Sequence, residues 1–167
     1  MNAAKFVVSC LWIAVGLTSA ETSLVPAGGE TTWRYLDDKA VPGEGWSAPG
    51  FDDSEWKKGR GPLGYGKDGV ETLIQFGANP EEKPLTVYFR TTFQGPSKEK
   101  SEFAKLGLIV SYDDGVAVYL NGEEVARDNL EEGQLTPESA AIRAVRESGE
   151  LVTTIPVGSL LSLIHIS

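Results

Sequence analysis

Cysteine and histidine are almost absent from this 167-residue sequence, which contains one of each, Cys10 and His165. A single cysteine cannot form a disulfide within the chain, so a folded domain has to depend on its hydrophobic core. A single histidine leaves little material for a nucleophile–base pair or a histidine-ligated metal site. The composition therefore argues against Ser-His and Cys-His enzymes.

Basic residues are also scarce, with 15 Lys and Arg against 24 Asp and Glu and a formal net charge of −9. An acidic surface is repelled by the phosphates of nucleic acids and by anionic lipid headgroups. We therefore expect neither nucleic acid nor a membrane surface as a partner. The charge balance does not by itself select a ligand.

The long apolar run of the sequence lies at the N-terminus. Residues 6–17 follow one basic residue, Lys5, and precede the small residues Thr18-Ser19-Ala20. This pattern is typical of a secretory signal peptide over residues 1–20, cleaved after Ala20. The alternative, a membrane span, is disfavoured because the run is too short to cross ~30 Å of hydrocarbon. A signal peptide predicts a secreted, periplasmic or cell-surface protein with no membrane attachment after cleavage.

The remaining sequence divides into three predicted parts. We expect a flexible lead-in over residues 21–30, one domain over residues 31–160 and a non-native tail over residues 161–167. The tail reads LSLIHIS and resembles a translated sequencing adapter; the alternative is a genuine apolar strand. On the adapter interpretation His165 is not native.

Short apolar or alternating segments separated by Gly and Pro predict an all-β protein. The alternation places Trp33 and Tyr35 on one face of a strand, and we expect Trp33, Trp56 and Tyr112 in the core. Thr136-Pro137-Glu138 has the pattern of a helix start, but the weak apolar periodicity that follows leaves helix and loop open. The expected fold is a two-layer antiparallel β-sandwich, truncated at its C-terminus. Its expected strands cover residues 31–36, 85–93, 103–112, 116–120, 123–127 and 151–155, with a short one over 72–76.

Residues 106–127 organise this fold. They contain two turn signals, Asp113-Asp114-Gly115 and Asn121-Gly122. Asn-Gly favours a type I′ hairpin, because both central residues of that turn need a positive φ angle. The stretch predicts three consecutive antiparallel strands that fix the register of one sheet.

Adjacent carboxylates occur in three places, Asp37-Asp38, Asp52-Asp53 and Asp113-Asp114. A glycosidase needs two carboxylates that flank one bond, about 5–10 Å apart. Neighbouring acids on a tight turn generally point apart, and nothing in the sequence brings two from separate strands together. We therefore expect no enzymatic activity in this chain.

Four residues are candidates for ligand binding, and we expect two of them, Asp113 and Asp114, to lie on an exposed loop. Asp113 and Asp114 either satisfy backbone N–H groups of their turn or supply oxygen ligands to Ca²⁺, which takes six to eight of them. Trp46 and Tyr65 lie in Gly-rich segments and offer exposed faces on which a sugar ring can stack. We expect no cofactor, and a structural calcium ion is the alternative.

Five blocks of residues, in this order, resemble a galactose-binding-like jelly-roll domain over residues 31–160. The resemblance implies a non-catalytic accessory module of an exported multidomain protein, often beside a metallophosphatase-like domain. It implies carbohydrate as the partner, or alternatively a structural spacer that packs against a neighbouring catalytic domain. Such domains often hold a structural calcium ion. The resemblance also implies that at least one strand is missing after residue 160, which leaves a sheet edge unpaired. The blocks are Trp33-x-Tyr35, Phe51-Asp52-Asp53-Ser54-x-Trp56, Pro62-Leu63-Gly64-Tyr65-Gly66, Tyr88-Phe89-Arg90-x-x-Phe93, and Asp113-Asp114-Gly115 followed by Tyr119-Leu120-Asn121-Gly122-x-x-Val125-x-Arg127.

Overall fold

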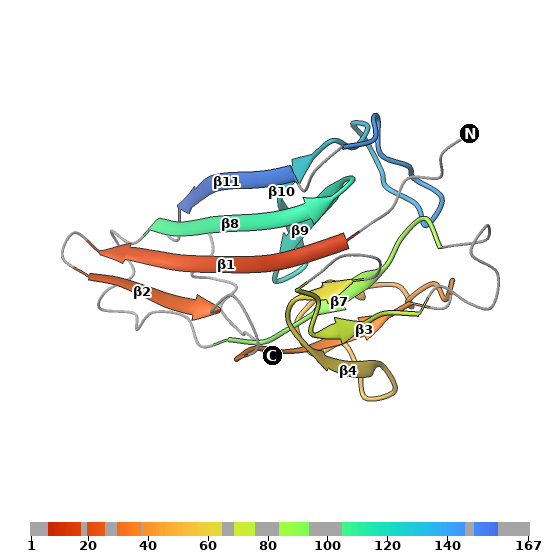
Figure 1. Cartoon of the computed structure of the whole chain (residues 1–167), viewed down its shortest axis with the longest axis horizontal. Coiled ribbons are helices and arrows are strands. Elements are labelled where there is room, and N and C mark those ends of the chain that lie inside the picture. Colours follow the sequence, from red (N-terminus) through yellow and green to blue (C-terminus); the bar gives the residue numbers. More distant parts are fainter. Residues whose placement is uncertain are drawn as a thin grey trace.

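The computed structural model shows an all-β protein, as the sequence predicts (Figure 1). It describes the chain apart from residues 1–6, 18–19, 26–29, 38, 65–68, 76–83, 94–104, 146–148 and 157–167. The described residues form strands, turns and loops, and none of them forms a helix. Nothing in this part of the chain is therefore a helix long and apolar enough to cross a bilayer. The antiparallel sheets are consistent with a β-sandwich.

The largest sheet has four antiparallel strands in the order β11-β8-β1-β2. Its central strand β8 alternates, with Leu108, Val110 and Tyr112 buried on the face toward the core. This period of two is what a strand with one buried face requires. The bounds are Val7–Leu17 for β1, Ala20–Val25 for β2, Lys105–Asp113 for β8 and Gly149–Pro156 for β11.

The second sheet has the order β4-β3-β7, with β3 in the middle. Trp33 and Tyr35 are both buried on β3, so the predicted face of that strand is confirmed. Within the predicted strand over residues 85–93, only β7 forms backbone hydrogen bonds with a neighbouring strand. Phe89 and Phe93 pack against the core, as expected. The bounds are Thr32–Leu36 for β3, Lys57–Arg60 for β4 and Tyr88–Arg90 for β7.

Two smaller pairs complete the described strands. β9, Val116–Leu120, and β10, Glu123–Asp128, form the predicted hairpin. Asn121 has φ 53° and Gly122 has φ 92°, which confirms the two positive φ angles of the predicted turn. The other pair is parallel and joins β5, Leu63–Gly64, to β6, Thr72–Leu73.

The prediction that β8, β9 and β10 follow one another in a single sheet is wrong. β8 belongs to the four-stranded sheet, while β9 pairs with β10 in a separate two-stranded sheet. The turn at Asp113-Asp114-Gly115 carries the chain from one sheet to the other. A Cβ atom on Gly115 would lie 2.9 Å from the Leu130 side chain, so the turn packs tightly against the segment after β10.

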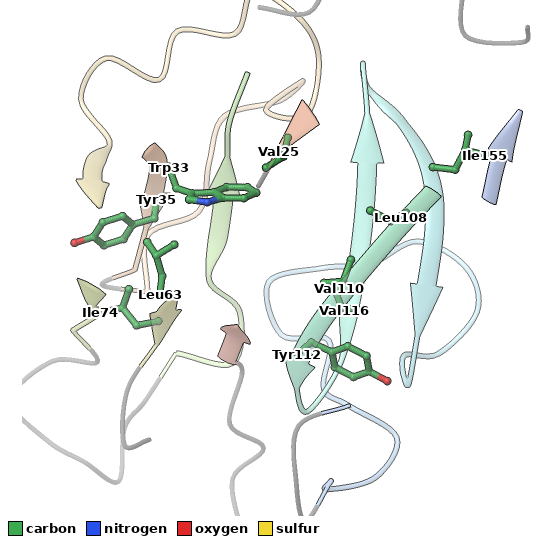
Figure 2. Close-up of a cluster of buried hydrophobic side chains, with 10 residues drawn as sticks. All are labelled: Val25, Trp33, Tyr35, Leu63, Ile74, Leu108, Val110, Tyr112, Val116 and Ile155. Carbon is green, nitrogen blue, oxygen red and sulfur yellow. The ribbon is translucent and has the colours of Figure 1, made fainter. Parts of the chain in front are cut away.

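The core lies between the two larger sheets (Figure 2). One group of buried side chains surrounds Trp33, and the other lines β8 and the start of β9. Trp56 is buried as predicted and contacts Phe51 edge-to-face, with ring centroids 6.0 Å apart. The core side chains drawn are Val25, Trp33, Tyr35, Leu63, Ile74, Leu108, Val110, Tyr112, Val116 and Ile155.

The segment after Thr136 is a loop, which decides between the two structures that the sequence left open. Thr136 Oγ1 accepts a hydrogen bond from the Glu138 N–H at 3.3 Å, and the Ser139 N–H donates to Thr136 O at 3.0 Å, so a single capped turn forms. No helix continues from this turn, because backbone groups that a helix would pair within itself are hydrogen-bonded to Asn129. The Ile142 N–H donates to Asn129 O at 3.0 Å, and Asn129 Nδ2 donates to Arg143 O at 2.7 Å.

The predicted signal peptide coincides with a strand in this structure. β1 lies between β8 and β2, and its register with β8 runs from Val7 opposite Asp113 to Gly16 opposite Lys105. Part of the predicted lead-in forms β2. The tail predicted to be non-native, residues 161–167, lies outside the described residues.

Candidate functional site

Trp46 is the candidate residue around which the structure gathers other aromatic side chains. It is half-buried on the loop between β3 and β4. Its ring meets Tyr88 of β7 edge-to-face at 5.0 Å between centroids, and Tyr119 of β9 in the same way at 5.4 Å. Such pairs contribute about 0.5–1.5 kcal/mol each beyond the area they bury. The three rings thus bring together strand β7, the β9–β10 hairpin and the loop between β3 and β4.

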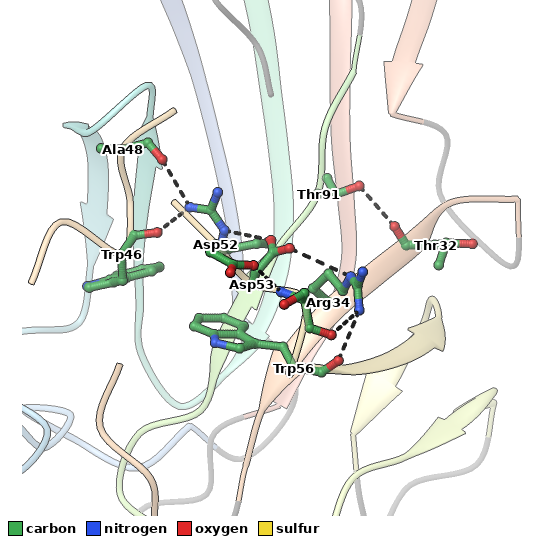
Figure 3. A network of polar contacts seen from close by, with 10 residues as sticks. Thr32, Arg34, Trp46, Ala48, Asp52, Asp53, Trp56 and Thr91 are labelled. Atoms are coloured by element: carbon green, nitrogen blue, oxygen red, sulfur yellow. Dashed lines mark hydrogen bonds and ion pairs between the residues drawn. The ribbon is translucent and has the colours of Figure 1, made fainter. Parts of the chain in front are cut away.

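Arg90 of β7 fixes the position of the Trp46 loop by binding its carbonyl groups at Trp46 and Ala48, which are labelled in Figure 3. Its Nη1 donates to Trp46 O and also to Ala48 O at 3.4 Å. Its Nε donates to Asp53 Oδ2 at 2.9 Å, and its guanidinium lies 5.3 Å from the centre of the Phe51 ring. The Arg90 side chain is only 11% exposed, so these charged hydrogen bonds are poorly screened by solvent.

Asp53 also forms an ion pair with a second arginine, Arg34 of β3. Arg34 Nε lies 3.7 Å from Asp53 Oδ1, and Arg34 Nη1 donates to Ser54 O at 3.1 Å and to Trp56 O at 3.2 Å. Asp52 Oδ1 accepts from the Ser54 N–H at 3.0 Å, which closes the turn. That hydrogen bond is also the first cause of a lowered pKa of Asp52. The network thus joins the acidic turn at Asp52-Asp53 to Arg34 of β3 and Arg90 of β7.

Side chains of β10, the second strand of the hairpin, fix the position of Tyr119. Its hydroxyl donates to Glu124 Oε2 at 3.0 Å, and Arg127 donates to both oxygens of Glu124, at 2.6 and 2.7 Å. Burial and this hydrogen bond raise the pKa of Tyr119 to about 12. The Arg127 hydrogen bond holds the pKa of Glu124 below its usual value. Burial, followed by the charge of Glu138, also raises the pKa of Tyr88. Both tyrosines are therefore neutral at physiological pH.

A cavity of about 280 Å³ begins beside these rings and extends into the core. Its outer end is lined by the aromatic group together with Asn121, Thr136 and Ser139. Its inner end reaches Leu108 and Val110, which are each 1% exposed. A concave site with mainly apolar walls and a few polar groups is the usual form of a ligand pocket.

Asp113 and Asp114, predicted as an exposed turn awaiting a ligand, are buried at 7% and 4% exposure. Asp114 Oδ1 accepts from the Val145 N–H at 2.7 Å, and Asp114 O accepts from Asn129 Nδ2 at 2.8 Å. The peptide bond between the two aspartates is cis. The prediction that this turn is an exposed loop is wrong, because the segment after β10 folds over it. Of the two interpretations, the structure supports backbone satisfaction for Asp114.

The structure does not bring the four predicted site residues together. Asp114 precedes the start of β9 and Trp46 contacts Tyr119 near its end, so the two candidates lie at opposite ends of that strand. Tyr65 lies outside the described residues. Within the described ranges, no group of three or more His, Cys, Asp or Glu side chains could hold a metal ion.

Sequence reasoning missed Arg90 as a residue that positions the site. The alternation of the segment around β7 puts Tyr88 and Arg90 on the face opposite Phe89, and this pairing of an aromatic residue with an arginine was the available signal. It could not indicate that the partner would be a loop more than forty residues earlier, at Trp46.

No family model matches this chain, and neither a curated protein nor a solved structure gives a match to it.

Proposed function

We propose that this chain is a non-catalytic, carbohydrate-binding module of an exported multidomain protein, with the galactose-binding-like jelly-roll fold that its five sequence blocks resemble. The observation that carries the proposal is the half-buried Trp46, fixed between two tyrosines at the outer end of a cavity. Aromatic side chains in such a position stack on the apolar face of a sugar ring. The nearby amide and hydroxyl groups supply hydrogen bonds to its hydroxyls.

The polar groups at the cavity rim support this ligand class. Ser139 Oγ accepts from the Thr136 N–H at 2.8 Å, and Thr136 Oγ1 accepts from the Glu138 N–H. A hydroxyl group has one donor and two acceptor sites. Both side chains therefore keep an O–H donor beyond these bonds, which a sugar hydroxyl oxygen can accept. Asn121 also lines the cavity.

The rigidity of the site also favours binding over a passive role. Arg90 holds the Trp46 loop, and the Glu124–Arg127 pair holds Tyr119, so the rings are positioned before a ligand arrives. Less conformational entropy is then lost on binding. The acidic surface is compatible with a neutral ligand such as a glycan.

A glycan array probed with the full chain tests the proposal, followed by calorimetric titration of each hit. We expect Trp46→Ala to abolish binding and Trp46→Phe, which keeps a stacking ring, to retain part of it. Leu73→Ala is the matched control, because Leu73 is 68% exposed and does not line the cavity. Absence of binding to every glycan would reject the proposal and favour the spacer alternative.

A further inference from the structure

The inner part of the cavity differs chemically from its rim. Its lining includes side chains of both core groups, namely Trp33 from the smaller sheet and Leu108, Val110 and Ile155 from the larger one, which are drawn in Figure 2. Its floor is therefore made of hydrocarbon side chains. A sugar hydroxyl placed there would lose its hydrogen bonds to water without replacement, at a cost of about 1–3 kcal/mol per group.

The polar groups that line the cavity do not relieve this cost. Arg90 is engaged with Asp53 and the Trp46 loop, and Thr86 Oγ1 donates to Pro137 O at 2.9 Å. Both lie on elements at the outer part of the cavity, on β7 and the residues before it. The interior is thus suited to an apolar group and the rim to a polar one.

The volume is large enough for such a group. An apolar cavity of about 150 Å³ is known to stay dry and to bind benzene. The cavity here, at about 280 Å³, is nearly twice that size, and its lining includes the half-buried Trp46 and the exposed Thr136. A hydrocarbon group entering from the rim would restore the van der Waals contacts that the lining side chains lack.

We propose that this cavity is a binding subsite for the apolar part of an amphipathic ligand, namely the alkyl or aryl aglycone of a glycoside. The sugar ring stays at the Trp46 rim, and the aglycone extends from its anomeric oxygen toward Leu108 and Val110. The assignment of the sugar rests on the proposed function. The assignment of the hydrocarbon rests on the cavity alone.

Calorimetric titration of the full chain with two series of probes tests this inference. The first series is methyl, butyl and hexyl β-glucosides and β-galactosides below their micelle concentrations, and the second is the alcohols butanol and hexanol. Burial of each further methylene group is expected to strengthen binding about fourfold in both series until the cavity is full.

Variants that fill the cavity provide the structural control. Val118→Phe, on β9, and Leu135→Phe, on the loop after β10, each add a ring to the lining and are expected to remove the dependence on chain length. Two positions are used because one of them can disturb folding, which circular dichroism would show. Val152→Phe is the matched control, since Val152 is 63% exposed on β11 and outside the cavity.

The outcomes separate the two proposals. Alcohol binding that grows with chain length, with no gain from an attached sugar, supports the cavity and rejects the carbohydrate function. Glycoside binding that is independent of chain length supports the carbohydrate function and overturns the cavity subsite. Lack of binding in both series overturns the cavity subsite as well. Chain-length dependence that persists in both filled variants also contradicts it.

Discussion

The carboxylate of Asp114 accepts a hydrogen bond from the backbone N–H of Val145 across 2.7 Å, joining two residues 31 positions apart. This bond closes the segment after β10 over the turn between the two sheets. It gives Asp114 a structural role in a place where the sequence suggested a ligand.

Replacement of Asp114 tests that role. Asp114→Ala leaves the Val145 N–H without its acceptor, and we expect the free energy of unfolding in urea to fall by about 1–3 kcal/mol. Asp114→Asn keeps a side-chain oxygen and is expected to lose less.

Calcium distinguishes the structural role from metal binding in the same experiment. We expect neither added Ca²⁺ nor a chelator to shift the unfolding midpoint of the unsubstituted chain. A Ca²⁺-dependent stabilisation that disappears in Asp114→Ala would show instead that the turn holds the ion.

Arg90 is expected to determine both stability and the environment of Trp46. Arg90→Ala removes charged hydrogen bonds to Asp53 and to the Trp46 loop, and a loss of about 2 kcal/mol is expected in urea unfolding. We also expect a red shift of the tryptophan emission, because the loop gains solvent access. Arg90→Lys keeps the charge but cannot reproduce the fork of donors, so it should restore little.

The ion pair between Arg60 and Glu71 provides the control for Arg90. These side chains are 60% and 43% exposed and 3.5 Å apart, so Arg60→Ala should cost no more than about 0.5 kcal/mol. Equal losses for the two arginine variants would contradict the positioning role of Arg90.

Local signals explain which parts of the fold could be predicted. The hairpin turn depends only on Asn121 and Gly122, and the burial of Trp33 and Tyr35 follows from alternation within β3. Such features need no knowledge of distant residues, which is why they were predicted correctly. The segment that begins at Thr136 has the sequence pattern of a helix start. It forms a loop instead, because the backbone and side chain of Asn129 form hydrogen bonds with it.

The candidate site depended on partners that the sequence does not specify. Asp114 is buried because Val145 covers it, and Trp46 is positioned because Arg90 reaches its carbonyl group. Neither the separation along the chain nor the residue types predict these contacts. The pattern could therefore identify Trp46 as a candidate, but could not identify Tyr88 and Tyr119 as its neighbours.

Stability should fall at alkaline pH through Tyr112. Burial, followed by the hydrogen bond of its hydroxyl to Asp128, raises the pKa of Tyr112 to about 12. An unfolded tyrosine titrates near 10. The folded chain therefore keeps the proton longer, so this stabilisation is complete below pH 10 and is lost as the pH rises from 10 to 12.

Urea unfolding between pH 9 and pH 11.5 measures this effect. Tyr112→Phe should be less stable than the unsubstituted chain at pH 9, because Asp128 loses its donor, and should show a shallower decline above pH 10. Tyr119, whose pKa is also about 12, still contributes to the decline in that variant. A decline of the same slope in both chains would contradict the assignment to Tyr112.

Removal of residues 1–20 tests whether β1 belongs to the working fold. The predicted cleavage after Ala20 would take away the strand that pairs with β8 along its length and would leave β2 without its neighbour. The freed edge of β8 exposes unpaired backbone groups, which promote association with other chains. We expect a chain that begins at Glu21 to unfold at lower urea concentration, by more than the 0.5–3 kcal/mol of most single substitutions. We also expect faster hydrogen exchange in β8 and partial dimerisation.

A chain that lacks only residues 1–6 is the control, since β1 begins at Val7. Unchanged exchange in β8 after removal of residues 1–20 would show that the sheet does not need β1.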